Sequence, residues 1–190
     1  MACVGVVNIA VVGPTGVGKT SLIQSLLSQQ SQISRNLYVR SHQPTREWLP
    51  HLYNGNTNIT FWDSPGYGEL LDVTENLSGG FYDGIILVVS DRMQAGEMDL
   101  LAEILRPNSK RLIVARIISQ AETHEDSDAV LAAMYEEFQH LRKDLFLVDL
   151  TNLDLYGFHD LVRHFNKANF RPRTSRRHMG RSTYSTSRLV

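Results

Sequence analysis

Cysteine is almost absent from this chain. Its 190 residues include a single cysteine, Cys3, so no internal disulfide can form. Such cysteine usage fits a reducing compartment. No apolar run reaches the length of a membrane-spanning helix, and the apolar N-terminus lacks the basic segment that opens a secretory signal peptide. Ala2 stands where N-myristoylation needs glycine. We therefore expect a cytoplasmic protein whose contacts with intracellular membranes, if it makes any, are peripheral.

Charge is distributed unevenly along the chain. The net charge is −1, but residues 171–190 carry six arginines and no acidic residue, which leaves −7 on the residues before them. The same segment is rich in Ser and Thr and has no apolar period, so we expect a disordered tail after a folded domain at 1–170. This tail suits contact with an anionic membrane, and the alternative is a solvated chain end. We expect no specific binding of nucleic acid.

The folded domain alternates buried strands with amphipathic helices. Aliphatic runs such as 84–90 are typical of parallel strands covered on both faces, and the apolar period of 128–143 indicates a helix that packs on such a sheet. This order predicts an α/β fold with a mostly parallel central sheet and helices on both faces. The predicted strands are 4–12, 58–63, 84–90, 111–118 and 145–150, and the predicted helices are 19–29, 97–105, 128–143 and 158–170.

The segment between the first helix and the second strand is polar and irregular. Residues 30–57 include Pro44, Pro50 and an Asn-Gly pair, which predicts a long loop with at most one edge strand. Long loops in compact domains are often functional, so we expect this one to contribute to a binding site.

The stretch GPTGVGKT, residues 13–20, matches the pattern G-x-x-x-x-G-K-[ST] in full. In this pattern the glycines let backbone N–H groups turn inward around phosphates, the lysine reaches the β- and γ-phosphates, and the final hydroxyl ligates Mg²⁺. A chance match is the alternative, but a strand precedes the motif and a helix follows it, as phosphate binding at a helix N-terminus requires. The predicted nucleotide-binding residues here are Gly13, Pro14, Thr15, Gly16, Val17, Gly18, Lys19, Thr20 and Ser21.

A second motif follows the strand 58–63. Asp63 ends that strand and begins the pattern D-x-x-G, which closes with Gly66. An acid at the carboxyl end of a sheet strand can hold Mg²⁺, and the Gly66 N–H can meet the γ-phosphate, whereas the alternative is an ordinary strand-ending turn. The long loop is expected to add a hydroxyl to the metal and the γ-phosphate, and its candidates are Thr45 and Ser41. Of these two we prefer Thr45, so the predicted metal ligands are Thr20, Asp63 and Thr45.

Four colinear segments carry a family resemblance. GPTGVGKT, WDSPGYG, YDGIILVVSDRMQAGEMDLLAEI and VDLTNLDLYGFHDLV, which lie within residues 4–168, resemble the GTPase domain of the immunity-related (interferon-inducible) GTPases. The resemblance implies a three-layer P-loop NTPase fold of the Ras-like type that binds GTP or GDP with Mg²⁺ and hydrolyses GTP slowly. It also implies association through the GTPase domain, with itself or with related GTPases, and action at membranes, often in cell-autonomous defence.

The sequence departs from this family where guanine is read. GTPases follow their fifth strand with [NT]-K-x-D, but here residues 117–120 are IISQ. Gln120 has one carbonyl oxygen and its own donors, so it does not replace the paired acceptance of the aspartate. Glu122 is a substitute if the loop shifts, and the alternative is that this loop reads no base. The loop that backs the base, usually rich in Ser, is here Asp149, Leu150 and Thr151. Gln120 and Asp149 are the candidate nucleotide-binding residues on the side of the base.

The groups that accelerate hydrolysis are also not evident. Tyr67 stands where Ras-like enzymes have a Gln that orients water, and Glu69 is more readily explained as a solvated residue. Arg46 and Arg92 are candidates for an arginine finger. The histidines of the last predicted helix, His159 and His164, are expected on the surface.

Three functional interpretations remain from the residues. The first is a slow, Mg²⁺-dependent GTPase switch, favoured by the intact set of Lys19, Thr20 and Asp63. The second is a degenerate GTPase domain that binds protein partners without catalysis, and the third is an ATPase or base-indifferent nucleotide binder. The altered guanine-reading motif favours the second and third.

Overall fold

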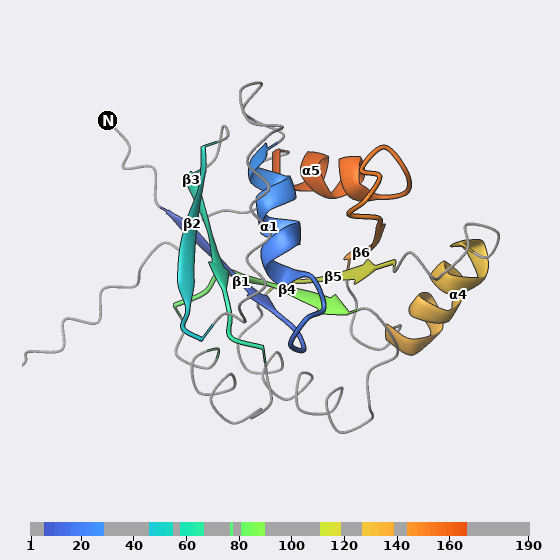
Figure 1. Ribbon diagram of the computed structural model, residues 1–190, viewed down its shortest axis with the longest axis horizontal. Coiled ribbons are helices and arrows are strands. Elements are labelled where there is room, and N and C mark those ends of the chain that lie inside the picture. Colours follow the sequence, from blue (N-terminus) through green and yellow to red (C-terminus); the bar gives the residue numbers. More distant parts are fainter. Residues whose placement is uncertain are drawn as a thin grey trace, which may run out of the picture.

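A six-stranded sheet forms the centre of the computed structural model, with strands in the order β2-β3-β1-β4-β5-β6 (Figure 1). The structure describes residues 6–28, 46–54, 58–66, 77, 81–89, 111–118, 127–138 and 144–166. Within them the elements are β1 (Val7–Val12), α1 (Lys19–Ser28), β2 (Leu49–Asn54), β3 (Asn58–Asp63), β4 (Gly84–Val89), β5 (Arg111–Ile117), α4 (Ser127–Phe138), β6 (Asp144–Val148) and α5 (Phe158–Asn166).

The sheet is parallel except at one edge. β1 pairs in parallel with β3 and β4, and the parallel ladder continues through β5 to β6. β2 pairs antiparallel with β3, so the edge strand allowed for in the long loop is present. The register sets Val11 of β1 beside Asp63 of β3. The carboxyl ends of these two strands therefore lie side by side.

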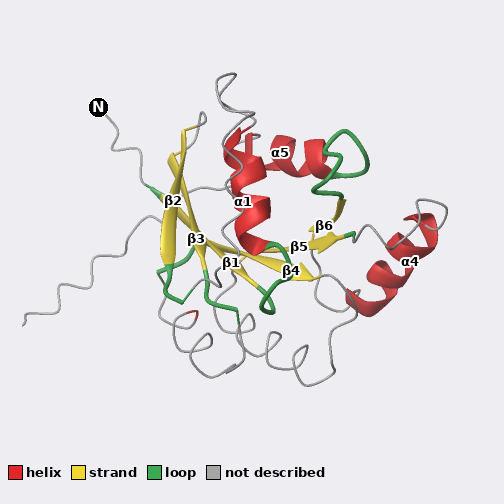
Figure 2. Ribbon diagram, viewed as in Figure 1, coloured by secondary structure: helices red, strands yellow, loops and turns green. Residues whose placement is uncertain are grey.

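Among the described helices, α1 and α5 cover one face of this sheet and α4 packs near β6 on the other (Figure 2). On one face, α1 and α5 bury Leu22, Ile23, Leu26, Phe158, Leu161 and Phe165 against the inward residues of the strands. On the other face, Met134 of α4 and Leu77 pack with the alternate strand residues. Both faces of β4 are buried, as its continuous aliphatic run predicts. The predicted α/β architecture with a mostly parallel sheet is confirmed.

Two sequence predictions need correction. The strand predicted at 145–150 ends at Val148, because the Asp149 carboxylate accepts hydrogen bonds from Thr151 and Asn152 and closes a turn there. His164 was expected on the surface, but its side chain is 11% exposed, whereas that of His159 is 47% exposed. The ring of His164 packs between those of Phe146 and Phe165, on the buried side of α5.

Several predictions lie outside the described residues. They are the helix at 97–105, the tail at 171–190, and the site residues Ser41, Thr45, Tyr67, Glu69, Arg92, Gln120 and Glu122. In the part of the chain that the structure describes, no helix is long and apolar enough to cross a membrane.

Candidate functional site

The loop between β1 and α1 is held tightly against β4. A Cβ atom added at Gly13 would lie 2.3 Å from the backbone oxygen of Val88, so no other residue fits there without backbone movement. Gly16 and Gly18 have φ angles of +80° and +100°, in the left-handed region that favours glycine. The glycines predicted to shape a phosphate cradle therefore have geometric reasons to be glycine.

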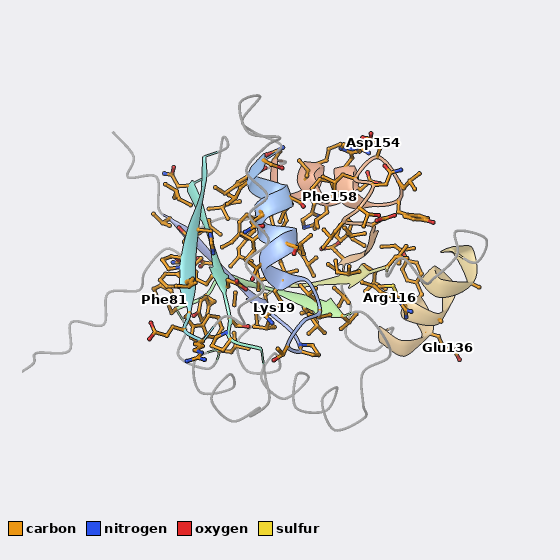
Figure 3. The ribbon with its side chains drawn as sticks, viewed as in Figure 1. Lys19, Phe81, Arg116, Glu136, Asp154 and Phe158 are labelled. Atoms are coloured by element: carbon orange, nitrogen blue, oxygen red, sulfur yellow. The ribbon has the colours of Figure 1, made fainter. Side chains whose placement is uncertain are left out.

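The side chain of Lys19 extends back into this loop (Figure 3). It is the first residue of α1, and its Nζ donates to the carbonyl oxygens of Gly13 at 3.1 Å and Pro14 at 3.0 Å. The residue is 6% exposed. Burial lowers the pKa of Lys19 from 10.5, and the charge of Asp63 opposes this shift. The loop thus surrounds the buried Lys19 ammonium group. An anionic ligand can contact this group only by binding within the loop.

Thr20 and Asp63 meet beside that lysine. The Thr20 hydroxyl donates to Asp63 Oδ2 at 2.5 Å, and Asp63 is fully buried at the end of β3. The next residue, Ser64, fixes the turn by donating its N–H to the carbonyl of Val11 at 3.1 Å. Two oxygen ligands of the kind that Mg²⁺ prefers therefore lie together next to a buried ammonium group.

These residues fit a nucleotide phosphate with Mg²⁺. A lysine at the loop centre, a helix N-terminus and a hydroxyl–carboxylate pair are the donor and acceptor set that a metal-bound triphosphate needs. Within the described ranges, no group of three or more His, Cys, Asp or Glu side chains could hold a metal by itself. Thr20 and Asp63 would hold Mg²⁺ only in combination with phosphate oxygens, and their ligand roles stay predictions.

The turn after β3 reaches back to the phosphate loop. A Cβ atom added at Gly66 would lie 2.1 Å from Thr15 Oγ1 and 2.5 Å from Thr15 Cα, so the Gly66 backbone touches Thr15 directly. Thr15 and Gly16 are exposed at the loop tip, while Pro14 is half-buried and Val17 is buried in the core. Ser21 is exposed in the first turn of α1.

The edge where a base would bind is apolar in its described part. A Cβ atom at Gly18 would lie 3.2 Å from Leu150 Cδ1 and 3.7 Å from Ile117 Cγ1. Leu150 therefore brings the loop after β6 against the end of the phosphate loop. Asp149 Oδ1 accepts from the Thr151 backbone N–H at 2.7 Å and from the Thr151 hydroxyl at 2.6 Å, so this carboxylate oxygen shapes its own turn.

The structure brings together most of the predicted site. Gly13 to Thr20, Asp63 and Gly66 meet at the carboxyl ends of β1 and β3, and Leu150, the residue after Asp149, packs against Gly18. Arg46, a candidate arginine finger, is exposed just before β2. The contact between Thr15 and Gly66 was not anticipated, because nothing in either motif alone specifies how closely the two loops approach.

Comparisons with known proteins agree with this geometry. A model of the family described as 50S ribosome-binding GTPase matches residues 8–151. Interferon-inducible GTPase 1 of Mus musculus is 28% identical over 103 residues, which cover 52% of this chain and 25% of that protein. Probable GTP-binding protein EngB of Syntrophus aciditrophicus (strain SB) is 42% identical over 61 residues, which cover 32% of this chain and 29% of that protein. The chain therefore spans well under half the length of these relatives.

Solved structures share the fold. Era of Aquifex aeolicus superposes with a TM-score of 0.64 and 19% identity, covering 90% of this chain and 58% of Era. The G domain of the T. maritima FeoB iron transporter superposes with a TM-score of 0.56 and 23% identity, covering 86% of this chain and 98% of that domain. At these identities the likeness shows the fold, which is that of the P-loop GTPases.

Proposed function

Since the chain belongs to the 50S ribosome-binding GTPase family, we propose that it is a Mg²⁺-dependent GTP-binding switch of the immunity-related type that hydrolyses GTP slowly. The observation that supports this most directly is the meeting of Lys19, Thr20 and Asp63 in one buried cluster. A domain that had lost nucleotide binding would have no reason to keep a desolvated lysine beside a desolvated carboxylate.

The described residues supply binding and charge complementarity. The Lys19 ammonium is held by the Gly13 and Pro14 carbonyls, and in the proposed complex it would contact the β- and γ-phosphates. The N-terminus of α1 adds the positive end of its dipole. Mg²⁺, when bound, would neutralise charge on the phosphate oxygens. Thr20 and Asp63 would orient that ion, and Gly66 would offer its N–H to the terminal phosphate.

The slow hydrolysis of GTP that we propose is argued from the residue that follows the D-x-x-G turn. Tyr67 occupies the position of the water-orienting Gln, so no amide is available there. We expect a turnover of monomeric protein on the order of 10⁻⁴ to 10⁻² s⁻¹, in the range of unstimulated Ras-like GTPases and their relatives. A fast turnover by dilute, monomeric protein would contradict this part of the proposal.

Isothermal titration tests binding directly. The wild-type chain is titrated with GTP, GDP and ATP in Mg²⁺, and Lys19→Ala is titrated with GTP. We expect GTP and GDP to bind the wild type and GTP binding to weaken strongly in Lys19→Ala, because the buried cation is lost. An absence of heat with every nucleotide would leave only the non-catalytic protein-binding interpretation.

A base-indifferent nucleotide binder is a second candidate, and one observation favours it. Ile117 and Ile118 occupy the first two positions of the guanine-reading motif. Ile117 belongs to the core cluster on one face of the sheet, and Ile118 packs against the cluster on the other face. An apolar surface discriminates weakly between purines, whereas a site that hydrogen-bonds the base discriminates strongly. Comparing GTP with ATP affinity in the wild type and in Gln120→Asp decides between the candidates. A preference for GTP already present in the wild type favours the GTPase.

The immunity-related type is supported by the partial match to Interferon-inducible GTPase 1 and by the colinear segments of the sequence. We propose on this basis that the domain associates with itself or with related GTPases when GTP is bound. Sedimentation of the chain with GDP and with a non-hydrolysable GTP analogue tests it, and an unchanged monomer in both overturns it.

The composition of residues 171–190 leads us to propose a cytoplasmic protein that binds intracellular membranes peripherally through this basic tail. Six arginines without a neighbouring acid in residues 171–190 would attract anionic headgroups. Flotation with vesicles containing phosphatidylserine is compared for the full chain and a chain ending at residue 170. Equal binding by both would exclude the tail as the membrane contact.

A further inference from the structure

The contact between Thr15 and Gly66 joins the two phosphate-binding motifs. Gly66 approaches so closely that Thr15 Oγ1, Cα and Cβ are the three atoms nearest to a Cβ placed on it, at 2.1, 2.5 and 2.7 Å. Neither motif specifies this residue pair, because the residue at position 15 is unrestricted in G-x-x-x-x-G-K-[ST]. Thr15 therefore sets how near the D-x-x-G turn comes to the phosphate loop.

The turn is fixed at its other end as well. Asp63 accepts the hydrogen bond of Thr20, and Ser64 is tied to β1 through its N–H. Pro65 restricts the backbone between these anchors and Gly66. The Gly66 N–H, the group expected to meet the γ-phosphate, thus has its position limited from the strand side by Asp63 and from the loop side by Thr15.

Thr15 is also chemically distinct within the loop. Between Gly13 and Gly18 it is the only residue with a polar side chain, and it is exposed at the loop tip. Its hydroxyl oxygen is the atom nearest to a Cβ placed on Gly66. A hydroxyl both donates and accepts a hydrogen bond, so it can contact a phosphate oxygen as well as pack on the turn.

We propose that Thr15 is a positioning residue that places Gly66 against the terminal phosphate of GTP and thereby sets the preference for triphosphate over diphosphate. This inference rests on the proposed function, because it presumes that GTP binds at this loop. A diphosphate lacks the terminal phosphate that Gly66 would meet, so its affinity should depend only weakly on Thr15.

Three variants of the full chain separate the shape of Thr15 from its hydroxyl. Thr15→Val keeps the branched shape without the oxygen, Thr15→Ser keeps the oxygen without the methyl, and Thr15→Gly removes both. Glu136→Gln, at an exposed position of α4 on the other face of the sheet, is the matched control (Figure 3). Affinities for GDP and for a non-hydrolysable GTP analogue are measured by titration in Mg²⁺, and kcat and KM for GTP are measured separately.

We expect the ratio of analogue to GDP affinity to fall about fivefold in Thr15→Gly and Thr15→Val, which both lack the hydroxyl that lies against the Gly66 turn, and to be retained in Thr15→Ser. GDP affinity should change less than about twofold, and kcat should fall more than KM changes. An unchanged ratio in Thr15→Gly and Thr15→Val, or equal losses for both nucleotides, overturns the inference while the proposed function stands. A wild type that binds neither nucleotide overturns the proposed function itself. Should Thr15→Gly fail to fold, the Val and Ser pair decides.

The contact can be tested without nucleotide. Gly66→Ala should lower the urea midpoint of the nucleotide-free chain, because the new methyl overlaps Thr15. Thr15→Gly in the same chain should restore part of that loss, since Oγ1 and Cβ of Thr15 are removed. A Gly66→Ala variant as stable as the wild type would show that the turn does not rest on Thr15 and would overturn the inference.

Discussion

Thr20 of α1 and Asp63 of β3 are joined by a hydrogen bond of 2.5 Å across 43 residues of sequence. The parallel register of β1 and β3 makes this possible, because it sets Asp63 beside Val11, shortly before the phosphate loop begins. The two predicted metal ligands are therefore in direct contact with each other.

Replacing Asp63 with Asn should remove the Mg²⁺ dependence of GTP binding. The amide oxygen can still accept from Thr20, but the charge that would face the cation is lost. We expect GTP affinity in Mg²⁺ to fall about tenfold or more and affinity in EDTA to change little. The pKa of Lys19 should also fall further, because Asp63 is the group that opposes the effect of burial. Asp154→Asn, at a carboxylate that is 91% exposed, is the control. Equal losses with and without Mg²⁺ would exclude a ligand role for Asp63.

Gly13→Ala and Gly16→Ala form a second test, of the loop itself. The added methyl at position 13 would overlap the Val88 carbonyl, whereas at position 16 it would meet open space but keep a φ of +80°. We expect Gly16→Ala to cost about 1–2 kcal/mol of unfolding free energy and Gly13→Ala at least about 3 kcal/mol. Urea unfolding of the nucleotide-free chain measures both, and equal losses would contradict the close approach at Gly13.

Ser64→Ala should leave the protein as stable as the wild type or make it more stable. Ser64 is fully buried, and its hydroxyl has no hydrogen-bond partner among the described residues. A buried hydroxyl without a partner costs about 1–3 kcal/mol, which alanine avoids. We expect the unfolding free energy to rise by up to about 2 kcal/mol in urea titrations. A loss of more than about 1 kcal/mol would mean that the hydroxyl has a partner that stabilises the fold.

The centre of the sheet could be predicted from sequence because β1 and β4 are largely buried on both faces. GIILVV of β4 is a continuous aliphatic run, and VNIAVV of β1 is interrupted only by Asn8, so both are typical of covered parallel strands. The end of β6 was missed because LFLVDL continues the apolar run through Leu150. The sequence Asp-Leu-Thr-Asn that follows Val148 carried the turn signal, since Asp side chains accept hydrogen bonds from nearby backbone N–H groups. His164 was likewise readable, because it lies three residues after the buried Leu161 on α5.

The site was predictable only where a motif carries its own geometry. GPTGVGKT specifies a loop, a lysine and a helix start, so the residues from Gly13 to Thr20 could be assigned before the structure. Contacts between two motifs depend on the tertiary structure, so they could not be assigned from the sequence. Two such contacts are that of Gly66 with Thr15 and that of Gly18 with Leu150. Both result from how far each loop extends beyond its strand.

Alkaline unfolding should report the burial of Tyr82. Burial raises the pKa of Tyr82 to about 12 from its ordinary value of 10.0. Trp48, Trp62 and Phe81 surround its ring. Between pH 10 and about 12 the unfolded chain therefore releases this proton while the folded chain keeps it, so the contribution of Tyr82 to stability is complete below pH 10 and is lost as pH rises through 12.

Tyr82→Phe should lose less stability than the wild type when the pH is raised through this range, because phenylalanine has no proton to release. Urea unfolding at pH 8, where neither state of the tyrosine is ionised, and at pH near 11 gives the difference for each chain. Tyr135→Phe, at a side chain that is 58% exposed, is the control and should follow the wild type. If Tyr82→Phe and Tyr135→Phe decline in parallel, the hydroxyl of Tyr82 is as readily ionised as an exposed one, and its ring cluster does not exclude water.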